Sequence, residues 1–191
     1  MIHALRHRAI PIATIGYVLL LLPPLRHLLE SRMFLQMLVQ MPLLVVIGYL
    51  LRGGIPRRLA AIIDPWNGQG ITGLLLASLT GMFWMLPRSL DAAVGEASME
   101  AAKFISIPLL IGLPIGLGWP RAGFVVRGVF LAELIATCFR LGWLYMVSPI
   151  RLCNSFLLGD QQRSGTYMMV IGAAILLYVI SKLMWGRIDS R

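Results

Sequence analysis

The chain of 191 residues carries a formal net charge of +9, and 58% of its residues are hydrophobic, with a mean hydropathy of +0.81. Because an ordinary soluble domain contains roughly 45–50% apolar residues, this composition excludes a water-soluble fold and indicates an integral membrane protein. The basic residues lie mostly in short joints between apolar segments and form no nucleic-acid-binding surface. We attribute the positive charge to membrane topology and to attraction by anionic lipid headgroups.

Apolar segments of membrane-spanning length follow one another along the chain. A helical span needs ~20 apolar residues to cross ~30 Å of hydrocarbon. The continuous apolar runs favour helices, because strands of a membrane β-barrel alternate in ~10-residue segments. We therefore predict an all-α fold, a polytopic membrane helical bundle of about six transmembrane helices that forms one domain over residues 1–191. The expected spans are residues 9–25, 33–51, 71–86, 101–119, 124–147 and 166–185.

The first apolar segment also has the charge pattern of a signal peptide, since Arg6 and Arg8 precede it. No small-residue cleavage site follows, and Pro23 and Pro24 lead directly into Arg26. We therefore expect this segment to be retained as the first helix.

The orientation of the bundle follows from Lys and Arg residues in the joints, because cytoplasmic loops carry an excess of these residues. Arg52, Arg57 and Arg58 lie beside two glycines and form a cluster typical of an inner loop. An even number of spans then places both termini in the cytoplasm. We expect a multi-pass protein of the bacterial inner membrane.

Methionines recur in the second segment at a spacing that indicates one helical face. Met33, Met37 and Met41 are four residues apart, and Gln36 and Gln40 follow the same spacing on the adjacent row. Thioethers are soft, neutral ligands that suit Cu(I). Methionine also fills irregular gaps between packed helices, so the same stripe is consistent with simple core packing.

Two pairs of charged residues within or next to the predicted spans are candidate sites. Glu133 and Arg140, seven residues apart, share a face of the fifth span, and they suggest either an ion path or, as we favour, a structural pair or a hydrogen bond to a neighbour. Glu100 and Lys103 are three residues apart at the start of the fourth span. We expect them to pair at the helix end, with Lys103 reaching outward to the membrane surface.

The fourth segment contains Pro108, Gly112 and Pro114, which predict a kinked helix and a close approach by a neighbour. A broken helix also occurs in transporters, but no inverted repeat is visible here. We expect Cys138 and Cys153 to be small buried residues without a disulfide. Motifs of hydrolases, kinases and dinucleotide-binding enzymes are missing, so we expect no enzymatic activity.

Two stretches resemble a known family. The run FWMLPRSLDAA, from Phe83 to Ala93, is similar to the WHLP…LYDAAL stretch of the CtaG-type cytochrome c oxidase assembly factors. Residues 158–165, LGDQQRSG, are followed by Met168 and Met169, and they resemble that family's L-x-D-Q-Q-x-x-G…MW entry to the last helices.

The second span is similar to the same family in its HMxQHxxL…P…G helix, with Gln40 and Pro42 present. The three stretches follow one another along the chain in the same order as in the family, and the resemblance covers about residues 27–187. It implies a membrane protein that helps to assemble a haem-copper terminal oxidase by supplying copper at the outer side. The expected partners are therefore this large membrane complex and lipid.

The chain departs from the family pattern where that pattern carries histidines. Met37 or its neighbours, Met85 and the segment 99–103 occupy those places. Of the three histidines, His3 and His7 lie at the inner N-terminus, which leaves only His27 on the outer side.

Two explanations stay open at this point. In the first, a softer site binds Cu(I) through Met33, Met37, Met85 and Met168, with His27 at its mouth. In the second, the metal site is lost and the scaffold is a non-catalytic structural subunit of a respiratory or other energy-converting membrane complex.

The triplet Asp160, Gln161 and Gln162 precedes the last span. We expect Asp160 to cap the free N–H groups of the following helix. In a functional role, the two amides would instead hold ligands of the outer loop in place.

Overall fold

The computed structural model describes residues 2–185, with side chains placed for residues 9–56 and 58–185. These residues form helices joined by short loops, which confirms the all-α prediction for the described part of the chain. In chain order the helical elements are α1 (Ile2–Leu21), α2 (Pro23–Glu30), α3 (Met33–Leu35), η1 (Gln36–Gln40), α4 (Met41–Leu51), η2 (Arg52–Gly54), α5 (Arg57–Ile63), α6 (Ile71–Met85), α7 (Pro87–Gly95), α8 (Ala97–Ser106), η3 (Ile107–Gly112), α9 (Leu113–Gly118), α10 (Phe124–Val147) and α11 (Leu158–Met184).

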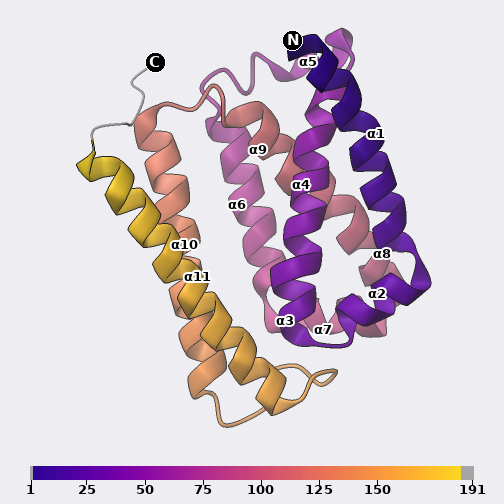
Figure 1. Cartoon of the computed structure of the whole chain (residues 1–191), viewed down its shortest axis with the longest axis vertical. Coiled ribbons are helices and arrows are strands. Elements are labelled where there is room, and N and C mark those ends of the chain that lie inside the picture. Colours follow the sequence, from indigo (N-terminus) through magenta and orange to yellow (C-terminus); the bar gives the residue numbers. More distant parts are fainter. Residues whose placement is uncertain (1, 186–191) are drawn as a thin grey trace.

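The chain runs back and forth between two ends of an elongated bundle (Figure 1). The start of α1, next to α5, and the end of α11 lie toward the same end of the bundle but on opposite sides of it (Figure 1). The opposite end carries α2, α3, α7 and the loop of residues 148–157, and we call it the α2–α7 end. The antiparallel hairpin of α10 and α11 stands beside α6 (Figure 1).

Prolines end two helices and turn the chain along the α2–α7 end. The residue before a proline is driven out of the helical region, and Leu22 and Leu86 are both extended, with ψ of 129° and 133°. The chain consequently bends by 72° between α1 and α2 and by 70° between α6 and α7. The first continuous helix therefore ends at Leu21, before the residue 25 predicted for the first span, because Pro23 begins a separate bent helix.

Three continuous helices, 33–54, 97–118 and 158–184, are long and apolar enough to cross a membrane, and the count rises to five if each bent pair is one span. These findings support a membrane protein with three to five spanning helices. The last span begins within a helix that starts at Leu158 rather than at residue 166. The predicted span 124–147 corresponds to α10, which is not among these helices, so this span and the cytoplasmic placement of both termini stay predictions. Residues 186–191 lie outside the described part.

Two π-helical turns, η1 and η3, interrupt the second and fourth spans next to prolines. Proline has no N–H to give to the carbonyl four residues earlier. Pro108 therefore leaves the carbonyl of Phe104 without its usual α-helical donor, and the hydroxyl of Tyr17 in α1 donates to this oxygen at 3.2 Å. The fourth span accommodates Pro108 in this wider turn, has Pro114 in the first turn of α9, and runs as one helix from Ala97 to Gly118.

Glycines bring the central helices into backbone contact. A Cβ atom added to Gly48 of α4 would lie 2.1 Å from the carbonyl oxygen of Pro108, and one added to Gly112 would lie 2.3 Å from that of Val45. Gly142 and Gly165 join α10 to α11 in the same way. Such close crossings are typical of helix packing in membranes, and they confirm the close approach expected for the fourth span.

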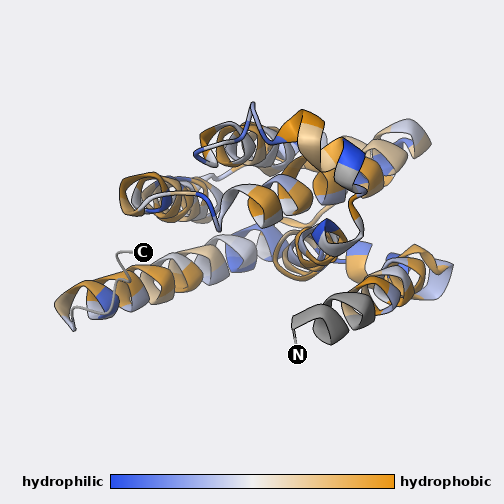
Figure 2. Cartoon of the chain, turned by 90° about the horizontal axis from the view of Figure 1, so that it is seen from above, coloured by the Kyte–Doolittle hydropathy of each residue, from blue (hydrophilic) through white to orange (hydrophobic). Residues whose placement is uncertain are grey.

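The outer faces of the helices are apolar (Figure 2). Val125, Val129 and Leu177 expose 65–71% of their surface. In water these faces would be unfavourable in a monomer. A lipid environment, or another apolar partner, explains them.

Candidate functional site

The second span brings its methionines into the interior. Met33, Met37 and Met41 are each at most 4% exposed and belong to one core cluster. Met37 lies on the π-helical turn η1, and Met33 and Met41 lie on the α-helical segments on either side of it. Met168, which reaches the same cluster from α11, is 1% exposed. We call Met33, Met37, Met41 and Met168 the methionine cluster.

The other two predicted ligands lie differently. Met85, at the end of α6, is half-buried and packs against the edge of the core that contains the methionine cluster. His27 lies exposed on α2 and is not part of this core. Met33, Met37 and Met168 are therefore buried in the same core, Met85 packs at the edge of that core, and His27 lies outside it.

Gln40, which lies between Met37 and Met41 in the sequence, takes part in a buried network that contains an ion pair. Lys103 of α8 has no exposed surface, and its Nζ donates to Glu30 Oε1 at 2.5 Å and to Gln40 Oε1 at 3.1 Å. Gln40 Nε2 in turn donates to Glu30 Oε1 at 3.2 Å. Each of the three side chains bonds both others, as expected for charged groups held in a buried site.

This arrangement corrects the expectation that Lys103 pairs with Glu100 and reaches outward. Glu100 instead lies 2.8 Å from Arg26 Nη1 of α2, in a half-buried pair nearer the surface. Lys103 turns inward because α2 folds across the end of the bundle and brings Glu30 to it. The bend before Pro23 thus supplies α8 with Glu30 as an acceptor, and η1 of the second span supplies Gln40. Local spacing could reveal neither acceptor.

Gln36 is the least satisfied polar side chain near the methionines. It has no exposed surface, and neither Oε1 nor Nε2 has a hydrogen-bond partner among the described residues. Leaving a buried amide unpaired costs about 1–3 kcal/mol. Such a side chain needs a partner from outside the chain or a functional reason for its position. Gln36 precedes Met37 on η1, so this unpaired amide lies on the same turn as a buried thioether.

The two stretches that carry the family resemblance meet at the loop of residues 148–157. Gln161 Oε1 accepts from the N–H of Leu152 at 2.8 Å, and its Nε2 donates to the carbonyl oxygens of Tyr145 and Ile150, both at 3.4 Å. Asp91 of α7 accepts from two further backbone N–H groups of the same loop, at 3.1 and 2.7 Å. One carboxylate and one buried amide therefore hold this loop against the bundle.

The prediction that Asp160 caps the last helix is wrong. No side chain caps α11, whose N-cap position is Leu157, and Asp160 lies in its first turn. A carboxylate in the first turn still interacts favourably with the helix dipole. The role of holding the loop belongs to the neighbouring Gln161, because that side chain points inward while Gln162 is exposed.

On α10, Glu133 is close to Arg140 and accepts a hydrogen bond from a neighbour, which is the structural arrangement that we favoured over an ion path. Thr137 donates its hydroxyl to Glu133 Oε1 at 2.9 Å, and Arg140 Nη2 lies 4.0 Å from the same oxygen. Cys138 and Cys153 are both buried and free, as expected. Among the described side chains, no group of three or more His, Cys, Asp and Glu residues could hold a metal ion, and His3 and His7 lie outside that part.

Sequence reasoning missed the Glu30–Lys103–Gln40 network and the anchoring of the loop by Asp91. A signal for the network was present, since a lysine inside an apolar span needs a partner, but its acceptors lie 73 and 63 residues away. Comparison with protein-family models, curated proteins and solved structures finds no match to this chain.

Proposed function

We propose that the chain is a copper-handling assembly factor for a haem-copper terminal oxidase, and that Cu(I) is its cargo. The observation that carries the proposal is the burial of Met33, Met37 and Met168 in one cluster, contributed by helices far apart in the sequence. Thioethers bind soft ions and need no deprotonation, whereas Ca²⁺ and Mg²⁺ require several oxygen ligands. The donor set therefore fits Cu(I).

Two further features support this proposal. The unpaired amide of Gln36 lies on the same helical turn as Met37. The stretches that resemble the CtaG-type assembly factors meet at the same α2–α7 end, where Asp91 and Gln161 hold one loop. In this proposal Met33, Met37 and Met168 hold the ion, Met85 lies beside them, and His27 offers a first contact at the surface.

The experiment is metal analysis of the reduced, gently solubilised full chain. We expect about one copper per chain after incubation with Cu(I), and loss of this copper in the Met37→Leu and Met168→Leu variants, because leucine keeps the volume but removes the sulfur. Met184→Leu is the matched control, since Met184 is 78% exposed at the far end of α11. The proposal would be refuted if the chain binds no copper, or if copper binding survives both cluster substitutions.

A second candidate function is a structural subunit of a larger respiratory or other energy-converting membrane complex. The helix 158–184 favours it, because only 11% of its apolar window is buried within the chain, against 39% and 44% for the other two continuous spans. A helix with so much free apolar surface can pack against helices of a partner. A large membrane protein in fixed stoichiometry, together with no copper, would favour this function over copper handling.

A further inference from the structure

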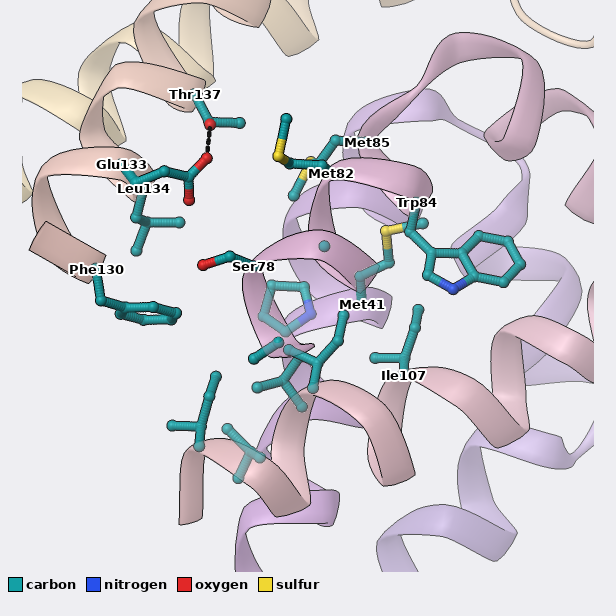
Figure 3. A pocket seen from close by; sticks show the side chains of 17 residues that line it. Met41, Ser78, Met82, Trp84, Met85, Ile107, Phe130, Glu133, Leu134 and Thr137 are labelled. Carbon is teal, nitrogen blue, oxygen red and sulfur yellow. Dashed lines mark hydrogen bonds between the residues drawn. The ribbon is translucent and has the colours of Figure 1, made fainter. Parts of the chain in front are cut away.

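A cavity of about 370 Å³ lies between α4, α6, η3 and α10 (Figure 3). Its wall is almost entirely apolar, with side chains that include Val45, Trp84, Ile107, Ile111, Phe130 and Leu134. This size and lining are typical of binding sites for small molecules. A second hollow of about 200 Å³ shares Met82, Met85 and Thr137 with it and continues along α10 toward Arg140.

Two polar groups point into this apolar space from opposite walls. Glu133 uses Oε1 to accept from Thr137, and its second carboxyl oxygen is directed into the cavity (Figure 3). The hydroxyl of Ser78 on α6 faces the same space (Figure 3). Among the described residues, neither Glu133 Oε2 nor the Ser78 hydroxyl has a hydrogen-bond partner. The cavity thus offers one strong acceptor and one hydroxyl that can both donate and accept.

The size and the surroundings of the cavity restrict what can enter. At roughly 30 Å³ for each water-sized group, its volume holds about a dozen linked carbon atoms. The site lies among helices that we place in lipid, so its ligand must be soluble in the hydrocarbon. A hydroxyl head can donate a hydrogen bond to the carboxyl of Glu133, whereas an ionised carboxylate head only accepts hydrogen bonds and cannot make this contact.

We propose that this cavity binds a lipid-soluble molecule that carries a hydroxyl group. The apolar part of the ligand fills the space between α4, η3 and Phe130. Its hydroxyl donates to Glu133 Oε2 and accepts from Ser78, so both polar groups gain partners. The proposal goes beyond copper handling and does not depend on it, because no residue assigned to hold the ion is needed for this contact.

The test uses the full chain in lipid nanodiscs and two photoreactive probes with the same twelve-carbon chain. One is dodecan-1-ol and the other is dodecanoate, each with a diazirine in the chain, and the cross-linked residues are mapped by mass spectrometry. We expect the alcohol to label residues that line the cavity about fivefold more than the carboxylate does, the ratio that corresponds to one net hydrogen bond. Excess unlabelled dodecan-1-ol should abolish this labelling.

Variants distinguish a built site from general partitioning into the bilayer. Gly81 lines the cavity, and a Cβ atom there would meet nothing within 4 Å, so Gly81→Leu should fill the space and remove the labelling. Gly128→Leu on the exposed side of α10 is the matched control and should label like the wild type. Glu133→Leu should lower labelling by the alcohol to the level of the carboxylate.

Equal labelling by the two probes would overturn the proposal. So would labelling of the cavity that survives Gly81→Leu, or labelling confined to the outer faces of the helices. Metal analysis of the same Gly81→Leu protein separates the two proposals, because copper binding should be unchanged.

Discussion

Lys103 and Glu30 form an ion pair within the helix bundle, where the lysine has no exposed side-chain surface and the glutamate only 9%. The pair joins α8 to α2, a helix that is bent by 72° from the span before it. Gln40 bonds both partners and extends the connection to η1. These contacts hold α2 across the end of the bundle, beside the turn that carries Met37.

Removing one member of this pair should destabilise the protein strongly. We expect Lys103→Met to lower the free energy of unfolding by about 3–5 kcal/mol, because it leaves the Glu30 carboxylate buried without its partner. Denaturation in mixed micelles measures this change. The double variant Glu30→Leu with Lys103→Met should recover much of the loss.

The exposed pair of Asp64 and Arg121 is the matched control, since its side chains are 50% and 34% exposed. Asp64→Asn should change stability by less than about 1 kcal/mol. A Lys103→Met protein as stable as the wild type would mean that the buried pair contributes nothing to folding.

Gly112 should tolerate no larger residue. A Cβ atom there would lie 2.3 Å from the carbonyl oxygen of Val45 and 2.8 Å from the Cα of Gly48, and backbone atoms cannot move aside cheaply. We expect Gly112→Ala to cost more than about 3 kcal/mol, beyond the range of ordinary substitutions. The measurement is the yield and thermal stability of purified protein.

Gly128→Ala is the control for this substitution, because a Cβ atom at that position of α10 meets nothing within 4 Å. It should be neutral, or stabilising by up to about 1 kcal/mol through helix propensity. Similar behaviour of the two alanine variants would contradict the close crossing of α4 and η3.

Gln161→Leu should release the loop of residues 148–157 without unfolding the helices. The substitution removes Gln161 Oε1, which accepts a hydrogen bond from the Leu152 N–H at 2.8 Å. Loss of one net hydrogen bond of about 1 kcal/mol corresponds to roughly fivefold faster amide exchange in this loop. Hydrogen–deuterium exchange measures it, and Gln162→Leu, an exposed neighbour, should leave the exchange unchanged. Equal exchange in the two variants would exclude Gln161 as the anchor.

Cys153 should react slowly with thiol reagents near neutral pH. Burial, and secondly the charge of Asp91, raise the pKa of its thiol from 9.0 to about 11, so about one thiol in a thousand is ionised at pH 8. We expect alkylation by iodoacetamide in a Cys138→Ser protein to rise steeply only toward pH 11. Denatured protein is the control and should react readily at pH 9.

The same pKa shift predicts a loss of stability in alkali. A thiol whose pKa is higher in the folded protein stabilises the fold at every pH below 9.0, and this contribution is lost as the pH rises from 9.0 to about 11. Cys153→Ser should remove that part of the pH dependence. An unchanged profile in the variant would mean that another group causes it.

The character of the individual helices was predictable from local pattern. The four-residue spacing of Met33, Met37 and Met41 indicated a shared face, and all three are buried. The end of the first span was misplaced because apolar content continues to Leu25, although the prolines after Leu22 already stop the helix. The prediction placed the end of this helix by hydropathy, whereas the backbone chemistry of proline decides it.

The network around Lys103 could not be predicted, because spacing along one helix shows only the partners on that helix. Glu100 was the acceptor within reach in the sequence, whereas Glu30 becomes available only when α2 folds back. The same reason explains the loop, where Asp91 and Gln161 converge from helices 70 residues apart along the chain.

The sequence by itself determined that this protein is helical and suited to a membrane, because a backbone in lipid must satisfy its own hydrogen bonds within apolar segments of sufficient length. It also determined which residues are available as soft ligands. Only the tertiary structure decided which of these residues gather, which charges pair and where a cavity opens beside Glu133. Those features depend on helix crossings, set by glycines such as Gly48 and Gly112, that join distant parts of the chain.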